Sequence, residues 1–230
     1  MEWDWDRGAE SLERAIALDP SNTWAYWLYG MLLTYQGRFD EAIEQMRLAQ
    51  RLDPVATAPI IEDLGSVYSL KGDLESAARA WQEALELSPH DYNIHRNLGN
   101  YLCRTGDFEG GLRELEQAVS VDHDEERGMA DLAYCHALAG NREKAEEYLR
   151  KLEERAEQRY VDPVHLALVH LGLGERDRTL ELLERAYEIH AQLLCEVPAD
   201  PRYAGLHADP RYEALLRGIG LGHLVAPLEG

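Results

Sequence analysis

Apolar and small residues recur in this chain with a period of about 34 residues. Seven positions before each of five glycines stands a small residue, and nine positions after it stands a bulky apolar one. Five positions after each glycine stands another small residue, and twelve positions after it stands an alanine in four of the five copies. Both lie on the same helical stripe as the bulky residue. Each period therefore predicts two amphipathic helices joined by a tight turn. The turn glycines are Gly37, Gly72, Gly106, Gly140 and Gly174, which stand 35, 34, 34 and 34 residues apart.

The matched positions indicate how the two helices of one period pack. Small side chains allow two helix axes to approach closely, and Pro54 and Pro89 stop the second helix of the first two periods. Because such a unit cannot bury its apolar face alone, successive units stack into a solenoid. The small residues are Gly30, Gly65, Gly99, Ala133 and Ala167, and the bulky residues are Met46, Trp81, Leu115, Leu149 and Leu183.

This order of residues resembles the tetratricopeptide repeat (TPR) family over roughly residues 4 to 190. The resemblance implies an all-α, right-handed superhelix (an α-solenoid) that forms a single array over residues 1–230. Gly111 departs from the pattern, since alanine is usual there, and it predicts loosened packing around that position. We expect a half repeat at the N-terminus, five full repeats and a C-terminal capping segment, with boundaries at 4–20, 23–56, 58–91, 92–125, 126–159, 160–190 and 191–230.

The two ends carry signals of their own. Residues 4–20 read as the second helix of a repeat whose first helix is absent, so an exposed apolar edge is expected around Trp3 and Trp5, where another copy or an upstream domain could dock. Near the other end, two Asp-Pro-Arg-Tyr motifs, 200–203 and 209–212, each offer an Asp N-cap followed by proline.

Three stretches resemble the TPR arrays of bacterial multidomain regulators. Those proteins carry a winged-helix, Ser/Thr-kinase or nucleotide-cyclase domain before the array. The resemblance implies that this chain is the sensing or docking part of such a regulator. The stretches are residues 4–22, 159–188 and 200–221.

Composition narrows the classes of partner and compartment. A formal net charge of −20 argues against nucleic acid and against anionic membrane surfaces. The acidic N-terminus lacks the basic region of a signal peptide, and the longest apolar run, Trp24 to Leu33, is too short to span a bilayer. Three widely spaced cysteines suggest no disulfide framework, so a reducing cytoplasm is the expected compartment.

Catalytic and metal-binding patterns are not found. His165 and His170 are five residues apart and do not share a helix face, and no HExxH or CxxC spacing is present. The glycines from Gly218 to Gly222 follow a helix rather than a strand, so they indicate helix termination and not a nucleotide loop. We expect no enzymatic activity, no cofactor and no metal.

In TPR arrays the first helix of each repeat lines a concave groove, and this resemblance gives a set of candidate peptide-binding residues. Arginines and asparagines in the middle of the set resemble the Lys/Asn/Arg clamp that some TPR co-chaperones use on a C-terminal carboxylate, although Asp131 stands where that clamp needs an uncharged or basic group. Guanidinium groups would suit an acidic ligand; alternatively, the arginines only neutralise neighbouring acids. The candidates are Trp24, Trp27, Met31, Tyr35, Glu62, Ser66, Arg96, Asn97, Asn100, Arg104, Arg127, Asp131, Tyr134 and His165.

The sequence therefore predicts a non-catalytic scaffold that binds a protein or peptide. The peptide is expected to place an acidic group or carboxylate near Arg96 and Arg104 and an apolar anchor near Trp27. Changing both arginines to glutamate should abolish binding of acidic peptides with little change in melting temperature. Two other hypotheses stay open: a structural spacer or oligomerisation module, and a small-molecule sensor with a closed pocket between helices.

Overall fold

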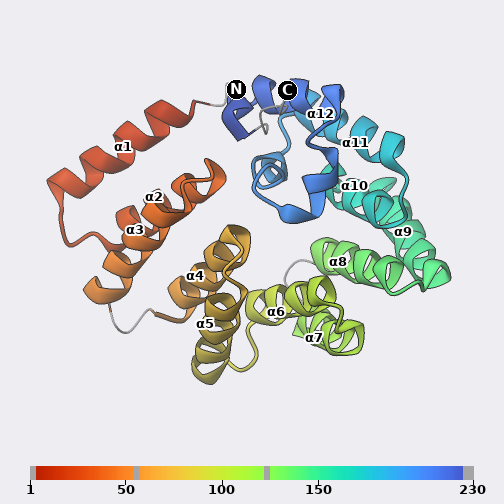
Figure 1. The fold of residues 1–230 in the computed structure, drawn as a ribbon, viewed down its shortest axis with the longest axis horizontal. Helices are drawn as coiled ribbons and strands as arrows, with labels where there is room; N and C mark the ends of the chain where they lie inside the picture. Colours follow the sequence, from red (N-terminus) through yellow and green to blue (C-terminus); the bar gives the residue numbers. More distant parts are fainter. Residues whose placement is uncertain (1–3, 54–56, 122–124, 225–230) are drawn as a thin grey trace. The chain divides into compact units, whose positions relative to one another are not determined.

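The regular structure of the chain is entirely helical. The computed structural model describes residues 4–53, 57–121 and 125–224, and every regular element within these ranges is an α-helix or a 3-10 helix (Figure 1). The all-α prediction is confirmed. The elements are α1 (Trp5–Leu18), α2 (Thr23–Tyr35), α3 (Phe39–Leu52), α4 (Thr57–Lys71), α5 (Leu74–Leu87), α6 (Tyr92–Thr105), α7 (Phe108–Val121), α8 (Glu125–Leu138), α9 (Arg142–Ala156), α10 (Pro163–Gly172), α11 (Arg176–Glu188), η1 (Gln192–Cys195), η2 (Pro201–Leu206), α12 (Pro210–Gly218) and η3 (Gly222–Leu224).

Helices α2 to α11 pack as consecutive pairs, in which α2 lies on α3, α4 on α5, α6 on α7, α8 on α9 and α10 on α11. The turn within each pair contains one of the five periodic glycines, whose φ angles lie between 73° and 92°. Residues with a Cβ rarely adopt this left-handed conformation, so the turn requires glycine. The spacing of the glycines therefore sets the spacing of the helix pairs.

Small residues face bulky ones inside the pairs. A Cβ at Gly30 would lie 2.7 Å from the Met46 side chain, and one at Gly99 would lie 2.7 Å from Leu115. At Gly65 the neighbour is the indole of Trp81, which is only 2% exposed and donates from Nε1 to the Glu62 carbonyl oxygen over 3.1 Å. Trp81, one of the periodic bulky residues, thus lies in the core of its pair.

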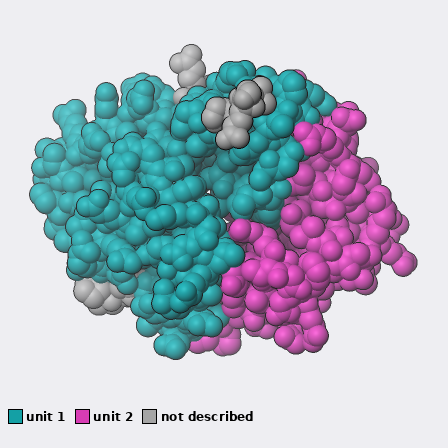
Figure 2. Space-filling view, in the orientation of Figure 1, with its two compact units in different colours: residues 1–88, 195–230 teal, residues 89–194 magenta. Residues whose placement is uncertain are grey.

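The chain forms two compact units (Figure 2). Unit 1 combines residues 1–88 with 195–230, and unit 2 is residues 89–194. Within unit 1 the two segments make direct contacts, since Trp5 Nε1 donates to the Ile219 carbonyl oxygen over 2.6 Å and His223 Nε2 lies 3.0 Å from the Gln36 carbonyl oxygen. The end of the described chain thus packs on its first helices.

Unit 2 contains a disulfide that the sequence did not suggest. Cys103 on α6 and Cys135 on α8 are bonded, with their Cα atoms 5.8 Å apart and both residues buried. The expectation of no disulfide is wrong for a physical reason: the 32-residue separation is close to the repeat period, so the two cysteines occupy neighbouring places on the first helices of successive pairs.

The packing around Gly111 is tight rather than loose. A Cβ there would overlap the Cys103 sulfur and would lie 2.8 Å from the Gly99 carbonyl oxygen. The predicted loosening is wrong, because glycine at this position makes room for the disulfide sulfur between α6 and α7. Glycine replaces the usual alanine here because the backbones of α6 and α7 approach each other closely at this position.

Aspartate caps begin helices near both ends, and those of the two Asp-Pro-Arg-Tyr motifs were predicted from the sequence. Asp4 caps α1 by accepting from the Arg7 backbone N–H over 2.9 Å. Asp200 and Asp209 cap the segments that start at Pro201 and Pro210, the first of which is a 3-10 helix and the second α12. Helix α12 ends at Gly218, as predicted, and Trp3 lies outside the described residues.

Candidate binding surface on the first helices

An apolar cavity of about 500 Å³ lies in unit 1 between α1 and α2. Its volume is within the range of ligand-binding pockets. Helix α2 is apolar around its whole circumference. One side, with Gly30 and Leu33, is buried against α3, and the apolar residues of the opposite side face the cavity. The lining residues are Asp4, Trp5, Leu12, Trp27, Leu28, Met31, Leu32, Tyr35 and Cys195.

Aromatic rings dominate this part of the surface. Trp24 is 68% exposed, and its ring lies edge-on to that of Trp27 with centroids 5.0 Å apart. The rings of Trp5 and Tyr35 are tilted with respect to each other, with centroids 6.4 Å apart. Leu28, also on α2, is 45% exposed. Trp24, Trp27, Met31 and Tyr35, four of the predicted binding residues, thus belong to one apolar surface.

A hydrogen bond fixes the orientation of the central indole. Trp27 Nε1 donates to Asp63 Oδ2 on α4 over 2.6 Å, so the ring is held between the first two helix pairs. The only charged residue that lines the described cavity is Asp4, whose Oδ1 also caps α1. The cavity is therefore apolar with a single carboxylate, and it would favour a ligand that is apolar and positively charged at one end.

Glu62 and Ser66, also predicted to bind, are used in packing. Glu62 is 8% exposed, and its carbonyl oxygen accepts the Trp81 hydrogen bond. Ser66 Oγ lies 3.4 Å from that same carbonyl oxygen. The Trp81 hydrogen bond holds α4 against α5, whereas the Ser66 contact lies within α4.

The arginine and asparagine positions belong to unit 2, and they do not share one environment. Arg96 is buried and pairs with Asp131, which is 1% exposed, over 3.2 Å. This contact favours the hypothesis that Arg96 neutralises a neighbouring acid. The other candidates here range from exposed to buried: Arg104 is exposed, Asn97, Asn100 and Arg127 are half-buried, and Tyr134 and His165 are buried.

The Arg96–Asp131 pair also changes the expected effect of a charge reversal. Glutamate at position 96 would place a second carboxylate beside buried Asp131, and like charges at a buried site are costly. The prediction of an unchanged melting temperature is therefore replaced by an expected loss of stability.

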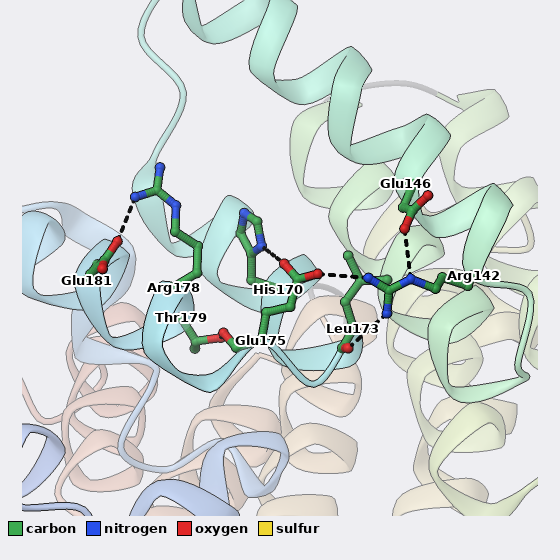
Figure 3. A network of polar contacts seen from close by, with 8 residues as sticks. All are labelled: Arg142, Glu146, His170, Leu173, Glu175, Arg178, Thr179 and Glu181. Atoms are coloured by element: carbon green, nitrogen blue, oxygen red, sulfur yellow. Dashed lines mark hydrogen bonds and ion pairs between the residues drawn. The ribbon is translucent and has the colours of Figure 1, made fainter.

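A polar network links two neighbouring pairs in unit 2 (Figure 3). Arg142 bridges Glu146 and Glu175, with nitrogen–oxygen distances of 2.8 and 2.9 Å, and His170 Nδ1 lies 2.7 Å from the other Glu175 oxygen. The hydrogen bond from His170, followed by that from Arg142, lowers the pKa of Glu175 below its ordinary value of 4.5. Arg142 stands two residues after the turn glycine Gly140, and Glu175 directly follows the next turn glycine, Gly174; sequence reasoning missed this signal.

The described part of the chain has neither a metal-binding cluster nor a membrane-spanning helix. Among residues 4–53, 57–121 and 125–224, no three His, Cys, Asp or Glu side chains gather in a metal-binding arrangement. No helix in the described part of the chain combines the length and apolarity needed to span a bilayer.

Helix pairs that turn on left-handed glycines, with small residues against bulky ones, define a helical-repeat protein. The tetratricopeptide repeat pattern matches residues 4–57 and 97–159, and a TPR repeat pattern matches residues 65–106. The chain belongs to the tetratricopeptide repeat family, whose members are generally protein-interaction scaffolds and typically non-catalytic.

Individual relatives match parts of longer proteins. The chain is 30% identical over 111 residues to the probable UDP-N-acetylglucosamine–peptide N-acetylglucosaminyltransferase SPINDLY of Hordeum vulgare, covering 46% of this chain and 12% of that protein. It is 25% identical over 169 residues to the DnaJ homolog subfamily C member 7 homolog of Schizosaccharomyces pombe, covering 67% of this chain and 35% of that protein. The chain thus spans about an eighth and about a third of these relatives.

The solved structure of the APC/C hetero-tetramer Cut9–Hcn1 has the same fold. Its TM-score is 0.62 at 16% identity, and the match covers 94% of this chain and 39% of that one. At this identity the likeness concerns the fold alone.

Proposed function

We propose that this chain is a non-catalytic scaffold that binds a protein or peptide segment on the apolar surface of α1 and α2. The observation that carries the proposal is the open cavity of about 500 Å³. Its rim includes exposed Leu28, and Trp24 lies beside Trp27 at the same surface. Exposed aromatic side chains beside a pocket are typical of the anchoring points of interfaces.

The proposed contact residues in unit 1 are Trp24, Trp27, Met31 and Tyr35. The acidic or carboxylate ligand expected at Arg96 and Arg104 has less support, because Arg96 already pairs with a buried carboxylate. We therefore base the proposal on unit 1.

The biological setting is also a proposal. The resemblance of three stretches to bacterial regulators supports a sensing or docking role within a longer protein. We keep the cytoplasm as the predicted compartment. The Cys103–Cys135 disulfide argues against this prediction, because disulfides persist mainly in oxidising compartments.

Selection of random peptides displayed on phage tests the function. Wild-type protein should enrich binders whose affinity falls at least about tenfold in Leu28→Lys, since a charged side chain would enter the cavity. Leu138→Lys is the matched control, because Leu138 on α8 is 41% exposed against 45% for Leu28. Failure to enrich any peptide, or equal loss in both variants, would contradict the proposal.

A further inference from the structure

Helix α1 leaves its apolar residues only partly covered. Each of α3, α5, α7, α9 and α11 lies on the helix that precedes it, whereas α1 packs on α2, the helix that follows it. No residue of α1 is buried, although its sequence is strongly amphipathic. Within the described residues, α1 has no preceding helix to pair with.

The cavity lies along the open side of this helix. Trp27, Met31 and Tyr35 follow each other at intervals of four on α2, so their stripe is about 12 Å long at 1.5 Å per residue. On α1 the lining runs from Trp5 to Leu12, about 10 Å by the same measure. Two apolar stripes, each about two turns long, together with Cys195, line a groove whose length suits the apolar face of a third helix.

Charge restricts which helix would bind there. Asp4 is the only charged residue that lines the described cavity, and α2 contains no charged residue at all. From residue 4 to residue 19 the sequence has five acidic residues against two arginines. A helix with basic side chains beside its apolar stripe would therefore be favoured, and a second copy of this chain, with a net charge of −20, would be repelled.

We propose that the groove between α1 and α2 binds a basic amphipathic helix of a partner protein, which packs against the apolar residues of both helices. The inference rests on the proposed function and specifies its ligand. Apolar side chains at i, i+4 and i+7 of the partner helix would enter the cavity, and a lysine or arginine at its edge would approach Asp4. Trp5 and Trp27, which line the cavity, would report the binding through their fluorescence.

Three synthetic peptides test the ligand. The first has leucines at i, i+4, i+7 and i+11 with lysines beside them, the second replaces each lysine by glutamate, and the third scrambles the first so that the leucines no longer share a face. Titrations with tryptophan fluorescence and calorimetry should show saturable binding of the first peptide alone. Equal binding of the glutamate peptide would overturn the charge argument, and equal binding of the scrambled one would overturn the helical ligand.

Two variants test the site. Leu28→Lys should weaken binding of the lysine peptide at least about tenfold, with Leu138→Lys unchanged. Asp4→Asn should weaken it about two- to fivefold and reduce its salt dependence, because asparagine keeps the helix cap and removes only the charge. Unchanged affinity in both variants would place the site elsewhere.

Other outcomes separate this inference from the proposed function. If displayed extended peptides bind in a Leu28-dependent way while the lysine helix does not, the function stands and the helical ligand is wrong. If neither class binds, both are wrong. Sedimentation that shows a dimer lost in Leu28→Lys would instead assign the groove to a second copy of the chain.

Discussion

Trp81 fills the space that Gly65 leaves between α4 and α5. Truncation to alanine should lower the free energy of unfolding by about 3–5 kcal/mol, the range for large aromatic residues in cores. Denaturant titration followed by circular dichroism measures this loss. Tyr160→Ala is the control, since Tyr160 is 67% exposed and its removal should change stability little. A Trp81 variant as stable as the control would contradict the packing described.

Arg96 and Asp131 are an ion pair that unit 2 keeps away from solvent. Arg96→Ala should cost about 3–5 kcal/mol, because the buried carboxylate loses its guanidinium partner. The double variant Arg96→Met/Asp131→Leu should recover most of that loss, since an apolar pair of similar volume needs no desolvation of charge.

The measurement for this pair is a double-mutant cycle of unfolding free energies. The exposed pair Arg79–Glu75, with side chains 68% and 83% accessible, provides the control, and Arg79→Ala should leave the stability nearly unchanged. If Arg96→Ala and Arg79→Ala lowered the unfolding free energy equally, the described burial of the Arg96–Asp131 pair would be wrong.

At the scale of elements, the Cys103–Cys135 disulfide joins α6 to α8, the first helices of neighbouring pairs. It closes a loop of 32 residues, for which the chain-entropy relation gives about 3–4 kcal/mol of stabilisation. Reductant should lower the unfolding free energy by this amount in the wild type, and it should have no effect on the stability of Cys103→Ala/Cys135→Ala.

Peptide mapping without reduction checks the pairing directly. It should recover the peptides containing Cys103 and Cys135 as one linked species. Cys195→Ser is the control and should keep the full response to reductant. A wild type whose stability does not change with reductant would contradict the prediction.

The contact between Glu175 and His170 links the end of α10 to the start of α11, and it makes the stability of unit 2 depend on pH. The pKa of Glu175 is lowered in the folded chain, chiefly by the hydrogen bond from His170. A lowered carboxyl pKa stabilises the fold at pH values above the unfolded pKa, and this contribution disappears as the pH falls through the folded pKa.

The stability difference between wild type and Glu175→Gln should therefore be constant near neutral pH and shrink below about pH 4.5, the ordinary value. Unfolding free energies measured from pH 7 down to pH 3 test this. Glu181→Gln is the control, because Glu181 pairs with Arg178 only at an exposed position. A difference that grows toward acid would give the wrong sign and reject the prediction.

At the scale of the whole molecule, unit 1 is assembled from both ends of the chain. Removal of residues 195–230 should loosen the start of α1, because Trp5 loses its contact with Ile219 and Gln36 its contact with His223. Hydrogen–deuterium exchange should become faster in α1 and near Gln36. The helices of unit 2 serve as the internal control, and unchanged protection of α1 would contradict the contact between the two ends.

The sequence predicted the helix pairs because their determinants are local. A turn with positive φ requires glycine, a close helix crossing requires a small residue, and a bulky residue on the facing stripe fills the space. Gly72, Gly65 and Trp81 show these three determinants within one pair. Asp209 and Pro210 show the same for a helix start, where the N-cap and the first-turn proline identify the boundary without reference to any other part of the chain.

The sequence by itself therefore determined the class of fold and the periodic turns, and it singled out the aromatic residues of α2 as candidates for a binding surface. Only the tertiary structure decided which polar and sulfur atoms meet across neighbouring helices. Arg96 reaches Asp131, 35 residues away, and Cys103 reaches Cys135, because stacking brings similar places of successive pairs together. The cavity also required three dimensions, since α1, α2 and Cys195 enclose it from opposite ends of the sequence.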